Sequence, residues 1–313
     1  MEVVTLGESM VLFTPDSVGS FVYAGKFDKT LGGAESNVAI ALSRLGHKVG
    51  WMSRLGNDDL GLFVRNFIRG EGVDTSNVVF DENYQTAVFF KERKNGAEPK
   101  VYYYRSNSAA SHMKAADLDE AYIAKAKFLH ITGITPALSE SCKETVYHAI
   151  SLARKNNVKV IFDPNIRLKL WSKDEAGTVL RDIARLCDVV LPGIEEGIIM
   201  TGQESPEAIA NALLQGETST VVVKLGKKGA YFATKSEDGY VNGEIVPIVV
   251  DPVGAGDGFA AGFISGMLRQ WTVRESVELA NKVASFALTV AGDVEGYPYW
   301  SQIESGQMEE ILR

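Results

Sequence analysis

Cysteine is scarce in this sequence, with two among 313 residues, at positions 142 and 187. Both fall in segments with a helical pattern, and their spacing is not that of metal ligands. The sequence therefore argues against a disulfide framework and against a cysteine zinc site. We expect Cys142 and Cys187 to be inert thiols in the core or near the surface.

Long apolar runs and a basic patch are also missing. No apolar run approaches 18 residues, and the chain starts on a strand-like segment without a basic n-region, so we predict no membrane span, no export and a cytoplasmic location. Lys and Arg total 32 against 40 Asp and Glu, a net charge of -8. This balance argues against a nucleic-acid partner, which needs a clustered basic face.

Two common phosphate-binding motifs are absent. No Gly-x4-Gly-Lys-Ser/Thr sequence occurs anywhere in the chain, which excludes a P-loop. The glycine cluster at 254–258 does not fit a dinucleotide fingerprint, because Phe259 stands where that motif needs a small residue. An acidic protein without these motifs must supply positive charge to an anion locally.

Strand-like and helical segments alternate along most of the chain, and 45% of the residues are hydrophobic. This alternation predicts an α/β fold with a mainly parallel sheet, helices on both faces and ligands at the carboxyl ends of the strands. The predicted strands are 3–7, 49–55, 128–132, 158–163, 189–191 and 220–225; the predicted helices are 34–45, 59–69, 140–155, 174–186, 206–214 and 273–291.

Two segments interrupt this alternation. Residues 10–30 are rich in Gly, Phe and Tyr, and residues 85–105 read as a hairpin around a turn at 95–96. We interpret them as a small β-sheet lid outside a core formed by 1–9, 31–84 and 106–313; the alternative is a decorated edge of the main sheet.

One stretch concentrates the chemistry. An apolar run at 245–250 predicts a buried strand, and the glycines that follow lead into a helical pattern. Backbone N–H groups of Gly254, Ala255 and Gly256 at a helix start form an anion site. An acid beside a bound phosphate is electrostatically disfavoured, so Asp257 suggests a general base on a hydroxyl. The alternative is that Asp257 is an ordinary helix N-cap.

Polar groups elsewhere suggest a second ligand. Asn37, after a diglycine at 32–33, offers a donor and an acceptor to hydroxyls. Tyr103 and Arg105 share one face of a strand, and Arg167 follows a strand end. Two arginines at one pocket would suit a carboxylate, although Arg167 could instead form a structural pair with Asp163.

Residues 251–257, followed by Phe259, Ala260, Ala261 and Gly262, resemble the C-terminal signature of the ribokinase-like (PfkB) carbohydrate kinases. The resemblance extends over essentially the whole chain. It implies a three-layer sandwich with a β lid, Asp257 as general base, and the amides of Gly254, Ala255 and Gly256 as the anion hole. Glu35 departs from the family's general pattern, where a small residue is frequent.

The same resemblance assigns the other site residues. The sugar site would comprise Gly32, Gly33, Asn37, Phe89, Tyr103, Arg105, Arg167, Asp257 and Asp293. The ATP site would comprise Lys224, Gly226, Gly229, Gly254, Gly256 and Asn281. Glu196 would contact Mg²⁺, through water, in a motif where Gly193 replaces the usual asparagine.

Within the family, the segments 103–105, 130–134, 163–171 and 292–296 are similar to those of kinases acting on 2-keto-3-deoxygluconate. This resemblance implies ATP- and Mg²⁺-dependent phosphorylation of the terminal C6 hydroxyl, in a homo-oligomer that pairs through the lid. The alternatives are a fructokinase or ribokinase, a nucleoside kinase, and a non-catalytic sugar or nucleotide sensor.

Overall fold

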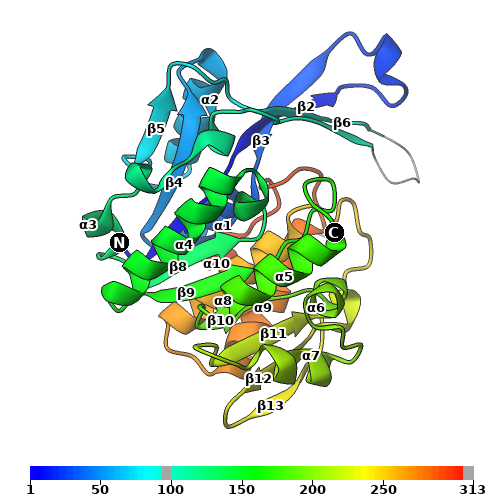
Figure 1. Cartoon of the computed structure of the whole chain (residues 1–313). Coiled ribbons are helices and arrows are strands. Elements are labelled where there is room, and N and C mark those ends of the chain that lie inside the picture. Colours follow the sequence, from blue (N-terminus) through cyan, green and yellow to red (C-terminus); the bar gives the residue numbers. More distant parts are fainter. Residues whose placement is uncertain (94–99, 306–313) are drawn as a thin grey trace.

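The structure, a computed structural model, describes residues 1–93 and 100–305 (Figure 1). Within these ranges the larger sheet has nine strands, which pair in parallel except that β12, near one edge, pairs antiparallel with both β11 and β13. This confirms the mainly parallel sheet. In spatial order the strands are β13 (Asp238–Val241), β12 (Ala230–Thr234), β11 (Thr220–Lys224), β10 (Val189–Val190), β9 (Lys159–Asp163), β8 (Phe128–Thr132), β1 (Val3–Leu6), β4 (Val49–Gly56) and β5 (Val78–Asp81).

Helices cover both faces of this sheet, as the alternation of segments predicts. One face carries α3 (Glu120–Ile123), α4 (Glu140–Lys155), α5 (Lys173–Ala184), α6 (Ile194–Thr201) and α7 (Pro206–Leu213). The other carries α1 (Ala34–Arg44), α2 (Asp59–Gly70), α8 (Ala255–Leu268) and α9 (Val273–Ala287). The short α10 (Trp300–Glu304) packs beside α9, and 3-10 turns lie at 21–23, 110–112, 115–117, 135–137 and 226–228.

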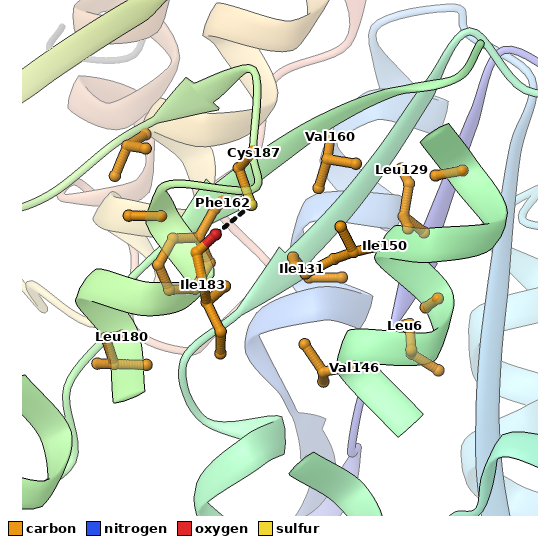
Figure 2. Close-up of a cluster of buried hydrophobic side chains, with 14 of the residues drawn as sticks. Leu6, Leu129, Ile131, Val146, Ile150, Val160, Phe162, Leu180, Ile183 and Cys187 are labelled. Atoms are coloured by element: carbon orange, nitrogen blue, oxygen red, sulfur yellow. Dashed lines mark hydrogen bonds between the residues drawn. The ribbon is translucent and has the colours of Figure 1, made fainter. Parts of the chain in front are cut away.

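The core on the α4 and α5 side is built from strand residues of alternate positions and one stripe of each helix. Figure 2 shows Leu129 and Ile131 of β8 facing Val146 and Ile150 of α4. Cys187 lies in the same cluster, where its thiol donates to the carbonyl of Ile183 at 3.2 Å. Both cysteines are buried and free, as the sequence predicts.

A second sheet stands apart from the first and extends over it (Figure 1). Its strand order is β3 (Phe27–Gly32), β2 (Met10–Pro15), β6 (Val88–Lys91) and β7 (Val101–Tyr104). The antiparallel pairing of β6 with β7 confirms the hairpin, while its predicted turn at 95–96 lies outside the described residues. The two interruptions therefore form one small sheet, although the division into core and lid segments at the stated boundaries stays a prediction.

Two local predictions are wrong. Residues 245–250 form no strand, and Ile245 is 86% exposed, because the sheet already ends at β13 and Pro247 interrupts any ladder of N–H donors. The helix predicted to reach residue 291 ends at Ala287. Within 1–93 and 100–305, no helix combines the length and apolarity that crossing a membrane requires.

Candidate active site

A cavity of about 680 Å³ lies between the lid and the carboxyl ends of the central strands. The core contributes residues near the carboxyl ends of β1, β9 and β11 and at the start of α8, and the lid contributes residues of β6 and β7. Of the predicted site residues, the cavity wall contains Gly32, Gly33, Asn37, Phe89, Tyr103, Arg105, Arg167, Glu196, Lys224, Gly226, Gly254, Gly256, Asp257 and Asp293.

Helix α8 begins at the cavity wall, and small residues leave the backbone of its first turn accessible from the cavity. Gly254 is its N-cap, at a φ of 79°, and a Cβ there would come 2.4 Å from the carbonyl oxygen of Asp293. A Cβ on Gly256 would instead meet only the Nζ of Lys224, at 4.0 Å. An anion can therefore approach the unpaired amides of the first helical turn, whose dipoles favour negative charge.

Asp257 is the third residue of α8, so the interpretation as an N-cap is wrong. Its carboxylate accepts a hydrogen bond from Nδ2 of Asn37, at 2.8 Å. Burial raises the pKa of Asp257 to about 7, although the bond from Asn37 acts in the opposite direction. A carboxyl that is half ionised near neutral pH is suited to accept a proton from a hydroxyl.

The lid side of the cavity is aromatic. Phe89 and Tyr103 stack with ring centroids 5.5 Å apart, and both line the cavity. A Cβ on Gly32 would lie 2.5 Å from Oδ2 of Asp293 and 2.7 Å from the ring of Phe89, so only glycine fits between them. Burial raises the pKa of Asp293 to about 7, and its Oδ1 has no hydrogen-bond partner among the described residues.

The two arginines predicted to bind a carboxylate differ in burial and in their ion pairs. Arg105 is buried and forms an ion pair with Glu8, whose other oxygen accepts from Ser108 at 2.9 Å. Arg167 is exposed at the cavity wall. Asp163 pairs with Lys224, at 2.7 Å, rather than with Arg167. Within the described ranges no carboxylate pairs with Arg167, so its charge is available to a ligand.

Only some of the residues predicted to bind ATP lie in the cavity wall. Lys224, from the end of β11, lines the cavity together with Gly226. Gly229 closes the turn before β12, where a Cβ would lie 2.0 Å from the carbonyl oxygen of Val241. Asn281 lies on α9 and donates to the carbonyl oxygen of Asn242 at 3.0 Å. The last two are not in the cavity wall, and their contact with ATP stays a prediction.

Glu196 holds the backbone around the cavity. Its two carboxylate oxygens accept from the amides of Gly193, at 2.6 Å, and Ile166, at 2.9 Å. Burial raises the pKa of Glu196, and the charge of Lys224 opposes that change. The described part of the chain contains no group of three side chains that would hold a metal by themselves.

Sequence reasoning assigned no site role to three acidic residues in or beside this cavity. Glu8 lies two residues after the end of β1, and the rule that ligands collect at the carboxyl ends of strands is a signal for it. Glu35, which departs from the family's general pattern, is fully buried and accepts hydrogen bonds from the hydroxyls of Thr132 and Thr135, and burial raises its pKa to about 7. Asp251, at the entry to the glycine stretch, forms a buried ion pair with the lid.

The nine-stranded sheet, the separate lid and the cavity between them define the class of protein as ribokinase-like. The sequence profile of the pfkB family carbohydrate kinases matches residues 1–299, and the chain belongs to this family of carbohydrate kinases.

Individual relatives agree with this assignment. The chain is 43% identical to a 2-dehydro-3-deoxygluconokinase of Bacillus subtilis (strain 168), over 97% of this chain and 95% of the relative. The crystal structure of a 2-dehydro-3-deoxygluconokinase from Thermotoga maritima matches with a TM-score of 0.88 and 27% identity, over 97% of this chain and 98% of the other. The structure of a putative ribokinase II from E. coli in complex with ATP and Mg²⁺ matches with a TM-score of 0.89 and 26% identity, over 97% and 98%.

Proposed function

We propose that this kinase transfers the γ-phosphoryl group of ATP to the C6 hydroxyl of 2-keto-3-deoxygluconate (2-dehydro-3-deoxygluconate), forming 2-keto-3-deoxy-6-phosphogluconate. The observation that carries the proposal is the position of Asp257, beside the open start of α8 and in a cavity that also contains Arg105 and Arg167. The name of the relative at 43% identity supports the same substrate.

In this proposal Asp257 accepts the proton of the attacking hydroxyl, and Asn37 holds its carboxylate in place through the 2.8 Å hydrogen bond. Asp257 acts only when ionised, so its pKa of about 7 leaves it competent at neutral and alkaline pH. General-base catalysis of this kind contributes about 10²- to 10⁴-fold to the rate. The amides of residues 254–256 stabilise the charge that develops on the transferred group.

The cavity fits a nucleotide triphosphate with a divalent cation. The space above Gly256, the charge of Lys224 and the turn at Gly226 form a cradle that a larger side chain at 256 would fill. Asp163, near this cradle, is paired with Lys224, so we assign the cation to the carboxylate of Glu196, in keeping with the preference of Mg²⁺ for few protein oxygens and retained water. When bound with ATP, Mg²⁺ would neutralise charge on the β- and γ-phosphates.

The sugar acid would lie between the lid and the core. We propose that Arg167 binds its carboxylate, that Arg105 reaches it from the pair with Glu8, and that Asn37 and Asp293 bind hydroxyls. Among the described residues, Oδ1 of Asn37 and Oδ1 of Asp293 have no hydrogen-bond partner, which supports this role. Closure of the lid with Phe89 and Tyr103 would exclude water and limit ATP hydrolysis.

We also propose a homo-oligomer that associates through the lid, and a cytoplasmic location. The lid bears exposed aromatic side chains, of which Tyr23 is 88% and Tyr104 is 66% exposed, and such surfaces are typical of association sites.

The test is an assay of ADP release with Mg-ATP, run on 2-keto-3-deoxygluconate, its galactonate epimer, fructose, ribose and adenosine. We expect turnover confined to the keto acids, and Arg167→Ala should raise KM for them. Asp257→Asn should keep sugar binding, measured by calorimetry, and lose turnover by about 10²-fold or more.

Other outcomes distinguish the alternatives. Turnover with fructose or ribose that is insensitive to Arg167→Ala would assign a neutral sugar, and a preference for adenosine would assign a nucleoside kinase. Binding of both sugar and ATP without any turnover would favour a sensor. Wild-type turnover by Asp257→Asn would remove the base from the mechanism.

A further inference from the structure

A buried ion pair joins the lid to the loop that enters α8. Nζ of Lys91 contacts Oδ2 of Asp251, 160 residues further along the chain. Lys91 is 7% and Asp251 8% exposed. A buried pair of this kind costs desolvation of both charges, and loss of one partner leaves the other charge buried without compensation. The pair therefore constrains the position of the lid relative to this loop.

On the core side, Asp251 organises the backbone around the proposed phosphoryl site. Its Oδ1 accepts from the amide of Val253, at 3.2 Å, directly before the N-cap Gly254. Its Oδ2 accepts from the amide of Gly292, at 3.4 Å, directly before Asp293. The same carboxylate thus connects the start of α8 to the segment that carries a proposed sugar contact.

On the lid side, Lys91 is the last residue of β6 and pairs with Val101 of β7. Phe89, two positions earlier and therefore on the same face of the strand, lines the cavity, as does Val101. The charge of Lys91 also acts on Asp293, whose pKa burial raises and Lys91 lowers. The strand that covers the sugar therefore also carries the cation that holds the phosphoryl loop.

We infer that Lys91 is a positioning residue for phosphoryl transfer. Through its ion pair with Asp251, a lid packed on the core fixes the conformation of the loop that leads to the amides of residues 254–256. This inference rests on the proposed kinase reaction and deepens it. Lys91 acts through Asp251 rather than on the substrate. A lid that is not seated would leave the amides imperfectly aligned and would admit water to the γ-phosphate, whereas binding of ATP alone would change little.

The test compares Lys91→Met with Lys91→Arg, which keeps the charge, and with Asp251→Asn. The matched control is Lys26→Met, which removes an exposed lid lysine. We expect Lys91→Met to lower kcat by about tenfold or more, the loss of one charge-assisted contact, with little change in the KM for ATP. The ratio of ADP released to sugar phosphorylated should rise. Lys91→Arg should recover most of kcat, and Lys26→Met should behave as the wild type.

A second readout does not depend on activity. Hydrogen exchange at the amides of Val253 and Gly292 should accelerate in Lys91→Met and in Asp251→Asn, and the double variant should be no faster than the faster single variant. Unchanged exchange at both amides, or a loss of kcat that Lys91→Arg does not reverse, would overturn the inference. If the wild type phosphorylates none of the assayed sugars, the proposed function fails, while the exchange measurement still decides whether Lys91 holds this loop.

Discussion

The hydrogen bond from Asn37 to Asp257 permits a quantitative prediction about pH. Asn37→Leu keeps a side chain of similar size on α1 but removes the Nδ2 donor, which lies 2.8 Å from Oδ2 of Asp257. That bond stabilises the ionised carboxylate and lowers a pKa that burial raises to about 7. The substitution should therefore raise the pKa of Asp257 and move the acidic limb of activity to higher pH.

The size of the shift follows from the energy of such a bond. A hydrogen bond to a charged group contributes about 1.5–3 kcal/mol, and one pKa unit corresponds to about 1.36 kcal/mol. Asp257 is only partly buried, so water replaces part of the bond, and we expect the lower end, a shift of about one unit. At pH 7 the ionised fraction would fall from about one half to about one tenth, a loss of about fivefold in kcat/KM.

The assay is kcat/KM for the sugar from about pH 5 to about pH 9, in a buffer series of constant ionic strength. Loss of a sugar contact at position 37 would lower the value that kcat/KM reaches at alkaline pH. A change in the pKa of Asp257 would instead move the pH at which kcat/KM falls on the acidic side, so the two effects can be told apart. Glu35→Gln is the matched contrast on the same helix. Because the buried Glu35 carboxyl interacts electrostatically with Asp257, removal of its charge should move the limb toward lower pH. An Asn37→Leu profile with a lowered plateau and an unmoved limb would refute the assignment of Asp257 to that limb.

Three further predictions concern stability and the helix start. Because burial raises the pKa of Asp257 from 3.8 to about 7 in the folded state, the wild type loses stability as pH rises from about 4 to about 7. Asp257→Asn should therefore melt above the wild type near pH 8, with the difference shrinking toward pH 4, and equal melting curves at both pH values would contradict this. Gly256→Ala should keep the melting temperature but lower kcat, whereas Gly254→Ala, at a positive φ and 2.4 Å from a carbonyl oxygen, should lower both. Phe162→Ala, in the core of Figure 2, should cost about 3–5 kcal/mol in urea unfolding, and Phe162→Leu clearly less.

Much of the fold follows from local patterns in the sequence. The alternation of apolar strands with amphipathic helices predicts the parallel sheet and both helical layers, because burial on two faces imposes those periodicities residue by residue. The break in that alternation predicts the lid. The glycines at 254 and 256 with Asp257 similarly predict the open helix start, because backbone freedom and the adjacent carboxylate are properties of neighbouring residues.

Local patterns fail where burial depends on distant parts of the chain. The run at 245–250 is as apolar as a core strand, yet most of it is exposed, because in the described part of the chain the larger sheet ends at β13 and the run joins no strand. Gly292 shows the same limit. Gly292 directly follows the helix predicted at 273–291, but α9 ends at Ala287, and the amide of Gly292 donates to Asp251 instead.

The partners of the charged groups were decided by tertiary structure alone. Asn37 bonds to Asp257 across 220 residues, Lys91 pairs with Asp251 across 160, and Arg105 pairs with Glu8. The sequence shows which residues carry charge, but the strand order and the position of the lid on the core determine which charges share a desolvated cavity. Since a carboxyl's pKa depends on that desolvation and on those partners, only the folded chain brings Asp257 to a value suited to a base near neutral pH.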